Sequence, residues 1–446
     1  MSLLTDPTAA TRWELAHEAA RPIRLGSVRR VLGNGFEVAG LDAAIGDLVM
    51  VETAHGQLSG LVVALHDDCV VVSAYGELDG LRCGQLASAP GGPPRLAVGP
   101  ALLGRVVNAL GDPIDDGPPL GAMQVVELDE RAPHPLRRQL ITQPMAVGVR
   151  AIDSAITCGR GQRIGIFAGS GVGKSTLLSM MVREATADVV VVGLVGERGR
   201  EVREFLENDL GPEGRAKSVV VVATGDEPAL MRLTAAQSAT RIAESFRDAG
   251  KDVLLLIDSI TRFAMAQREI GLAAGEFPAS RGYPPSVLSA LPRLLERAGA
   301  GPQGSITAFY TVLVEGDDMN DPVADAVRGI LDGHIVLTRA LAQRGHFPSI
   351  DVLASVSRVM NAVTTPEQQK LALELREQLA SYEESRDLIE VGAYVAGTNP
   401  KTDLAVARRD HVLAFLQQTS RDPVPFERVW QELRVALGTI SQGVAA

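Results

Sequence analysis

The spacing of apolar and polar positions divides the chain into three parts after a short leader. From Ile23 to Ser88, short β-branched runs follow one another closely, which predicts the strands of a small β-barrel. Gly33-Asn34-Gly35 is a hairpin turn signal between the first two runs. The proline- and glycine-rich stretch from Ala89 to Pro94 predicts a linker. The runs are Leu25–Leu32, Phe36–Val38, Asp47–Glu52, Leu58–Leu65 and Cys69–Ser73.

In the second part, nearly continuous apolar runs alternate with amphipathic helical stretches. Such runs are typical of central strands in a parallel sheet that is covered on both faces. The stretch from Pro228 to Ala249 predicts a long helix that ends at Gly250. This part predicts an α/β fold. The strand runs are Arg163–Phe167, Val189–Val195, Val219–Ala223, Val253–Ile257 and Ile306–Val312.

The third part predicts helices, because apolar residues recur every three or four positions. These helices are Glu367–Ser385, Asp403–Gln418 and Pro425–Leu437, with a break at Thr398-Asn399-Pro400. At the other end, Thr11–Ala20 fits a short amphipathic helix or a frayed terminus equally well. We therefore expect a leader (1–22), a β-barrel (23–95), an α/β domain (96–364) and a helical domain (365–446).

Composition narrows the possible functions. The net charge of −11 argues against a general nucleic-acid-binding protein, which usually has a basic surface. Cys69, Cys83 and Cys158 are too few and too scattered for a disulfide framework, so we expect a reducing cytosol. The N-terminus lacks the pattern of a signal peptide, and no apolar run approaches the roughly 20 residues that span a bilayer. Any membrane association is expected to go through partners or a surface contact.

A glycine-rich loop carries the strongest chemical signal. Ala168-Gly169-Ser170-Gly171-Val172-Gly173-Lys174-Ser175-Thr176 follows a strand run and precedes a helical run. This arrangement cradles the phosphates of a nucleoside triphosphate, with Lys174 on the β- and γ-phosphates and Ser175 on Mg²⁺. Ala168 stands where a glycine is usual, which is acceptable if the backbone φ there is not positive.

Two other strand runs end in acidic residues. Asp258 ends the run Val253–Ile257 and is expected to lie beside the magnesium ion. Glu197 and Arg198 follow the run Val189–Val195, so they belong at the edge of the sheet where ligands bind. Glu197 could orient or deprotonate a water, Arg198 could sense the γ-phosphate, and Glu201 could hold the metal through water.

Further motifs resemble the catalytic α/β-type ATPases, the group that includes the heads of rotary ATP synthases. The resemblance runs from about residue 23 to the end, and its motifs fall in the same order as in that group. They are Gly104–Asp115, Gly148–Asp153, Gly159–Arg163 and Pro348–Arg358.

Within that group, the chain most resembles the homo-oligomeric ATPase of type III export, which serves flagella and injectisomes. The alanine at position 168 is usual in this branch. The motifs that carry the narrower resemblance are Phe167–Ser175, Gly282–Val287, Leu291–Gly299, Glu315–Pro322, Asp387–Ile389 and Gly392–Tyr394.

The resemblance implies a role for each matching residue. Glu197 corresponds to the catalytic carboxylate, Arg198 to a γ-phosphate contact, and Arg358 to an arginine finger that enters the neighbouring subunit's site. Phe347 corresponds to an aromatic that stacks on adenine, although a core phenylalanine fits the sequence nearly as well. ATP would be held by Gly169, Ser170, Gly171, Val172, Gly173, Lys174, Ser175, Thr176 and Phe347, and Mg²⁺ by Ser175, Glu201 and Asp258, partly through water.

The resemblance also implies partners. They are further copies of the chain in a homo-hexamer, a stator-like regulatory protein at the N-terminus, a coiled-coil stalk in the ring centre facing the acidic loop Glu315–Asp321, chaperone–substrate complexes, and a membrane export gate. We expect a cytoplasmic enzyme at the inner face of the membrane, in a flagellar system, with no nucleic-acid partner. The alternatives are a catalytic subunit of a rotary ATP synthase, a non-catalytic ring subunit, and an RNA-translocating ring helicase.

Overall fold

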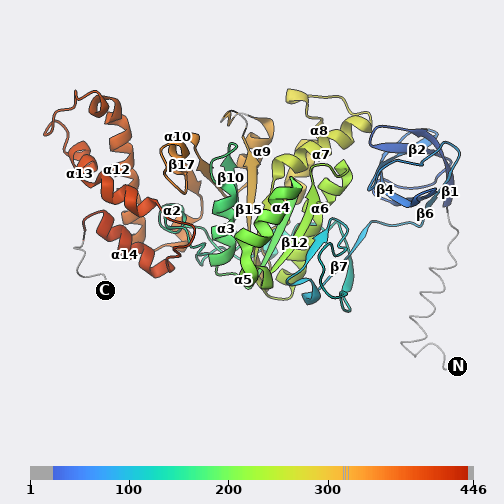
Figure 1. Ribbon diagram of the computed structural model, residues 1–446, viewed down its shortest axis with the longest axis horizontal. Coiled ribbons are helices and arrows are strands. Elements are labelled where there is room, and N and C mark those ends of the chain that lie inside the picture. Colours follow the sequence, from blue (N-terminus) through green and yellow to red (C-terminus); the bar gives the residue numbers. More distant parts are fainter. Residues whose placement is uncertain (1–23, 315, 317, 320, 440–446) are drawn as a thin grey trace. The chain divides into compact units, whose positions relative to one another are not determined.

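A computed structural model describes residues 24–314, 316, 318–319 and 321–439 (Figure 1). The predicted leader helix Thr11–Ala20 lies outside the described residues. Contacts group the chain into two compact units. The first contains the residues up to Pro94 with Ile270–Gly275, and the second contains Arg95–Glu269 and Glu276 onward.

The first unit contains a closed six-stranded barrel in the order β1-β2-β5-β4-β3-β6. In β3, buried Val49 and Val51 alternate with more exposed neighbours, so one side of the strand fills the barrel. The sequence predicted five strands and missed β6, which pairs with both β1 and β3 and closes the barrel. The strands are β1 (Arg24–Val31), β2 (Gly35–Ala39), β3 (Leu48–Thr53), β4 (Gly56–Leu65), β5 (Cys69–Ala74) and β6 (Leu86–Ala89).

The second unit contains the predicted α/β sheet, in the order β17-β16-β10-β15-β13-β11-β12-β8. Neighbouring strands along this path are parallel, except that β17 runs antiparallel to β16. The five predicted strand runs all form strands of this sheet. Its strands are β8 (Val106–Asn108), β10 (Arg163–Ala168), β11 (Val189–Glu197), β12 (Ser218–Thr224), β13 (Asp252–Asp258), β15 (Ser305–Leu313), β16 (Gly333–Leu337) and β17 (Ile350–Ser357), with β14 (Gly299–Ala300) paired to β15.

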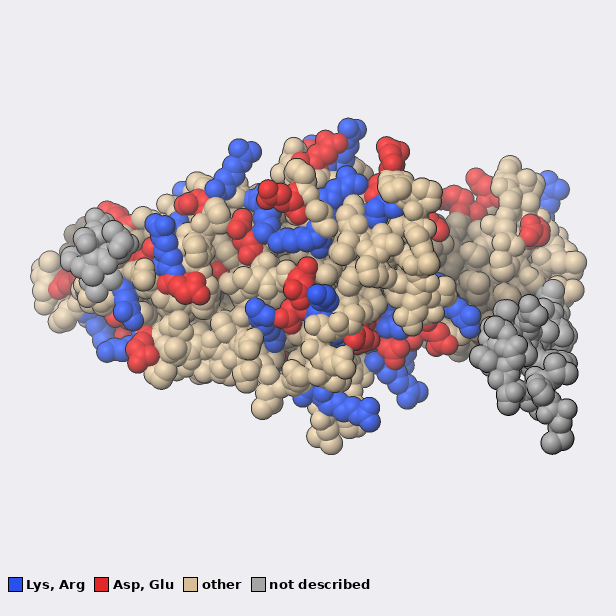
Figure 2. Space-filling view, turned by 90° about the horizontal axis from the view of Figure 1, so that it is seen from below, with Lys and Arg blue, Asp and Glu red and all other residues tan. Residues whose placement is uncertain are grey.

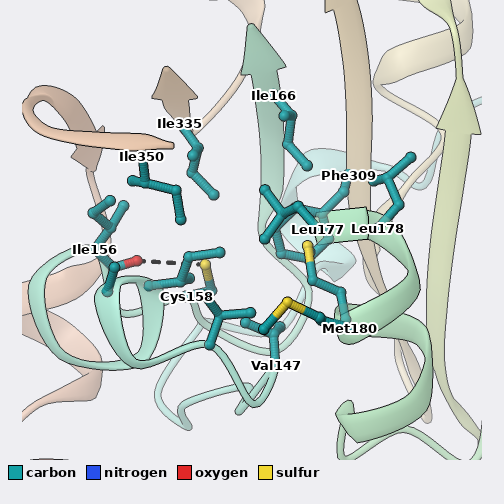
Figure 3. Close-up of a cluster of buried hydrophobic side chains, with 14 of the residues drawn as sticks. Val147, Ile156, Cys158, Ile166, Leu177, Leu178, Met180, Phe309, Ile335 and Ile350 are labelled. Carbon is teal, nitrogen blue, oxygen red and sulfur yellow. Dashed lines mark hydrogen bonds between the residues drawn. The ribbon is translucent and has the colours of Figure 1, made fainter. Parts of the chain in front are cut away.

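Helices cover the sheet and make its central strands fully buried. The predicted long helix is α6 (Ala229–Asp248), which packs on β11, β12 and β13. Figure 3 shows Leu177, Leu178 and Met180 of α3 (Lys174–Glu184) gathered with Ile166 of β10 and Phe309 of β15 in one apolar cluster. This packing fixes the helix that follows the glycine-rich loop against the strand that precedes it.

The three predicted C-terminal helices are present as α12 (Pro366–Glu390), α13 (Pro400–Leu416) and α14 (Phe426–Ala436). Thr365 and Gln368 form a capping box at the start of α12. At the predicted break, Asn399 caps α13 and Pro400 is its first residue. Leu375, Val412 and Leu433 belong to the same buried cluster as the sheet residues, so these helices share a core with the sheet.

The remaining elements are short or peripheral. None of the helices in the described part of the chain is long and apolar enough to cross a membrane. On the face shown in Figure 2, acidic and basic side chains are interspersed. The remaining elements are β7 (Arg95–Val98) paired with β9 (Gln124–Glu127), η1 (Pro100–Leu102), η2 (Pro135–Arg137), α2 (Arg150–Ala155), α4 (Gly199–Glu204), η3 (Phe205–Leu210), α5 (Gly211–Ala216), α7 (Ile260–Ala273), η4 (Ser280–Gly282), α8 (Pro285–Leu295), α9 (Pro322–Ile330), α10 (Arg339–Gln343) and α11 (Met360–Val363).

Candidate active site

The glycine-rich loop joins β10, in the interior of the sheet, to α3. Gly171 (φ 75°) and Gly173 (φ 86°) adopt the left-handed conformation, which an L side chain would strain. Ala168 is the last residue of β10 and pairs with Leu313 and Leu337 on the two neighbouring strands. Arg281 is the sole described non-glycine residue with positive φ, so the condition for an alanine at 168 is met.

Lys174, at the start of α3, lies between two acidic side chains that end strands. Its Nζ donates to Asp258 of β13 and lies 3.7 Å from Oε1 of Glu197 of β11. Burial alone would lower the pKa of Lys174, but the charges of Asp258 and Glu197 outweigh it and raise that pKa. The structure thus brings together three residues that are far apart in sequence and keeps the lysine charged.

Glu197 is the most perturbed acid in this cluster. Burial and the negative charge of Asp258 raise the pKa of Glu197 to about 7, against the opposing effect of Lys174. Asp258 is 5% exposed, and its Oδ1 accepts a hydrogen bond from the hydroxyl of Thr311 at 2.6 Å. A carboxyl group whose pKa lies near neutrality can exchange a proton at physiological pH, as a general base must.

The predicted magnesium residues line one small cavity. Ser175, Glu201 and Asp258 line a space of about 70 Å³ together with Glu197, beside α4 and the π-helix η3. A hydroxyl and several carboxylates are oxygen donors of the kind that Mg²⁺ prefers. The described residues contain no group of three His, Cys, Asp or Glu placed to hold a metal by themselves. The hydroxyl of Ser175 and the carboxylates of Glu201 and Asp258 fit a cation that also takes ligands from phosphate and water.

Arg198 is a predicted site residue that the structure leaves apart from the loop. It precedes α4, its side chain is 82% exposed, and its guanidinium lies 3.7 Å from Glu201. Nothing in these contacts directs Arg198 toward Lys174. Its expected contact with the γ-phosphate remains a sequence-based prediction.

A second cavity, of about 510 Å³, adjoins the other side of the loop and α3. Phe347 lies at its wall, 45% exposed, with its ring against Gly173. The alternative of a core phenylalanine is therefore wrong for Phe347, because nearly half of its surface is open. Residues that follow α13, including Gln418, complete the wall.

Gln418 connects three parts of this cavity and was not identified from sequence. It is 6% exposed, and its backbone N–H donates to the carbonyl of Phe347 at 2.9 Å. Its side chain donates to the carbonyls of Gly148 and Asp422 and accepts from the backbone N–H of Arg150. No local pattern marks such a residue, since Gly148 lies 270 positions away in sequence.

Two further residues near Glu197 were also missed. Thr311 positions Asp258, as described above. Arg262, in the first turn of α7, packs its side chain against Gly196, and its Nε is buried with no hydrogen bond to the described residues. Thr311 and Arg262 lie in β15 and α7, whose sequences carry no signal of their own for this site.

Arg358 lies near the start of β10, at the opposite end of the strands from the loop. Its N–H donates to the carbonyl of Asp332, and Asp332 in turn bonds Arg163, where β10 begins. The loop starts after β10 ends, about 20 Å away at 3.3 Å per residue. No arginine side chain spans that distance, so Arg358 cannot reach the phosphate loop of its own chain.

Two family models match parts of this chain. Residues 148–357 match the nucleotide-binding domain of the ATP synthase alpha/beta family, and residues 364–435 match the C-terminal domain of the type III secretion ATPase EscN. The flagellum-specific ATP synthase of Bacillus subtilis (strain 168) is 51% identical over 408 residues, which cover 91% of this chain and 93% of that protein. The chain belongs to the type III export ATPase family.

Other relatives of this export ATPase serve secretion. The SPI-2 type 3 secretion system ATPase of Salmonella typhimurium (strain LT2) is 55% identical over 344 residues, covering 77% of this chain and 79% of that protein. The assembled EscN of enteropathogenic E. coli, solved in complex with its central stalk EscO, is 46% identical with a TM-score of 0.85, covering 92% of this chain and 100% of that one. The resemblance and the fold class inferred from sequence are confirmed, and the chain is an ATPase.

Proposed function

We propose that this export ATPase works as a homo-hexameric ring that hydrolyses Mg²⁺-ATP at the interfaces between its subunits. The observation that carries the proposal is the separation of Arg358 from the phosphate loop across the sheet. A single chain carries both halves of the site but cannot bring them together. In a head-to-tail contact, every copy gives Arg358 to one neighbour and receives it from the other, and such contacts close into a ring. EscN has been solved as an assembled ATPase, which supports the assembly of several copies.

Each residue then has a defined task. The N–H groups at Gly169–Thr176 and the ammonium of Lys174 bind the phosphates, and Phe347 packs on the adenine. Ionised Glu197 orients a water and takes its proton as the water oxygen attacks the γ-phosphorus and the bond to ADP breaks. Arg198 contacts the γ-phosphate, and Arg358 of the neighbouring subunit stabilises the charge on the transferring group. Mg²⁺, held by Ser175 and through water by Glu201 and Asp258, would neutralise phosphate charge.

The export role assigns partners to particular parts of the chain. We propose that a coiled-coil stalk enters the ring centre at the acidic loop Glu315–Asp321, and the central stalk EscO in the EscN complex supports a stalk partner of this kind. In the described part of that loop, Asp318 pairs with Arg281 at 2.8 Å and Asp321 caps α9. A stator-like protein would bind the leader, outside the described residues. Chaperone–substrate complexes would be passed to a membrane export gate, with the ATPase cytoplasmic and peripheral at that membrane.

We propose the flagellar system rather than an injectisome. Flagellar export is the more common housekeeping system, and this base rate is the ground for the choice, because flagellum-specific and secretion-system relatives both align over most of this chain. Deleting the gene should abolish motility and the secretion of hook and filament subunits, and a plasmid copy should restore both. Full motility in the deletion strain would exclude the flagellar assignment and leave the injectisome.

Ring function is tested by the dependence of activity on concentration. Specific ATPase activity should rise steeply as the protein is concentrated through its assembly range, because the monomer lacks Arg358 at its own site. Light scattering on the same samples should show the hexamer appearing over the same range. Specific activity that stays constant while the protein remains monomeric would contradict the proposal.

A further inference from the structure

Two leucines stand almost fully in solvent on the segment that contains the short helix η2. Residues 134–142, which we call the leucine arm, contain Leu136 at 90% and Leu140 at 87% exposure. These are the most exposed leucines among the described residues. Isolated exposed leucines are common on protein surfaces, so exposure alone assigns them no role. Their anchoring and their neighbours are what distinguish them.

The arm is fixed in place by its polar side chains. The guanidinium of Arg138 donates to the carbonyls of Ala298 and Glu296, and the amide of Gln139 donates to the carbonyl of Pro302. All three acceptors belong to the segment around β14. The residues between the leucines are thus bound to the sheet edge, while Leu136 and Leu140 are held outward.

The arm leads directly to Arg358. Ile141 and Val359 both lie against Gly159, since a Cβ on that glycine would meet Ile141 Cγ2 at 2.3 Å and Val359 Cγ2 at 3.2 Å. Leu140 precedes Ile141, and Arg358 precedes Val359. The C-terminal part of the leucine arm and the chain next to the proposed arginine finger therefore meet at Gly159, at the end of the sheet away from the phosphate loop.

We propose that the leucine arm is an interface between copies of this chain, and that Leu136 and Leu140 pack on the neighbour that receives Arg358. This inference rests on the proposed ring. An arginine that must reach another subunit's site brings the surface around it against that subunit. Apolar side chains next to Arg358 would be covered in that contact, and covering them excludes water around the guanidinium. The anchored backbone lowers the entropy lost on docking.

Chemical labelling tests whether the arm is covered. Cys83 is exposed, whereas Cys69 and Cys158 are buried. A Cys83→Ser variant should therefore show little background labelling. In that background, the Leu140→Cys variant should react with a maleimide roughly tenfold or more slowly in the hexamer with a non-hydrolysable ATP analogue than in the dilute monomer. The matched control is Val406→Cys on α13, exposed to 42%, which should react equally in both states.

The possible results distinguish the proposal for the leucine arm from the proposal for the ring. A hexamer in which Leu140→Cys labels as fast as in the monomer overturns the arm proposal and leaves the ring intact. A protein that never assembles overturns both. Slow labelling in the dilute monomer as well would show that the arm is covered within its own chain, and this also overturns the proposal.

A second experiment tests whether the contact is needed. Leu136→Ser with Leu140→Ser should bind a fluorescent ATP analogue as the parent does, yet shift hexamer formation to about tenfold higher concentration or beyond. Leu373→Ser with Leu404→Ser removes two other exposed leucines, at 58% and 41%, and should assemble normally. Unchanged assembly of the arm variant would assign the leucines to a different partner and overturn the proposal.

Discussion

At the scale of single residues, the central fact is that Glu197 shares one buried space with Asp258 and Lys174. Two carboxylates and one ammonium leave a net negative charge, so burial and Asp258 favour the protonated form of Glu197. Its pKa is consequently raised to about 7. The residue assigned as general base is thus half ionised near neutral pH in the free enzyme.

The pH dependence of kcat/KM should reveal the raised pKa of Glu197. Because only ionised Glu197 can accept a proton, kcat/KM should rise as the pH rises through 7, by about tenfold between pH 6 and pH 8. Steady-state kinetics at constant ionic strength measure it. Glu197→Gln should keep nucleotide binding, lose turnover by roughly 10²-fold or more, and show no such inflection. An equally steep inflection in the Gln variant would assign the titration to another group.

At the scale of elements, the nucleotide pocket depends on the chain that follows α13. Gln418 ties that chain to Phe347 and to the segment before α2. The residue is 6% exposed and its side chain satisfies two carbonyls and one N–H, and leaving buried polar groups unpaired costs about 1–3 kcal/mol each. The C-terminal helices thereby help to set the position of the base-binding wall.

Gln418→Ala should therefore weaken ATP binding more than it slows chemistry. We expect KM for ATP to rise roughly tenfold, equal to about 1.4 kcal/mol, with kcat changed by less than about threefold. Gln343→Ala, an exposed glutamine at the end of α10, is the control. A fall in kcat with unchanged KM would argue against a positioning role for Gln418.

Sequence reasoning succeeded where a local pattern carried the information. The loop 169–173, Glu197 at the end of β11 and Asp258 at the end of β13 each follow an apolar run, so their place at the carboxyl ends of the strands could be predicted. Strand β6 has only four residues and two buried positions, too weak a pattern to stand out from the linker. Gln418, Thr311 and Arg262 act through neighbours far away in sequence, and only packing brings them to the site.

At the scale of the whole molecule, the two halves of the proposed site lie at opposite ends of the strands of one sheet. β10 begins near Arg358 and ends at the phosphate loop, so the strand itself holds the halves apart. The shared core of the sheet and the C-terminal helices makes this part of the chain stiff. Closing the site within one chain would require breaking that core.

Mixing two inactive variants should restore activity. Lys174→Ala removes the phosphate-binding half and Arg358→Ala removes the donated half, so each alone should lose turnover by about 10³-fold. In a mixed ring, some interfaces pair an intact loop with an intact Arg358, and ATP hydrolysis should recover there. Phosphate release from the mixture, compared with each variant at the same total concentration, measures it. A mixture no more active than its components would place Arg358 outside the site.

The separation of Arg358 from Lys174 also has a genetic meaning. In the proposed ring, a copy that has lost its arginine still occupies a place and still binds ATP, but it silences the site of the neighbour it should serve. A defective allele therefore lowers ATPase activity in proportion to the number of its subunits in the ring. In a cell that makes both forms, Arg358→Ala should be dominant over the intact gene, whereas a deletion should be recessive.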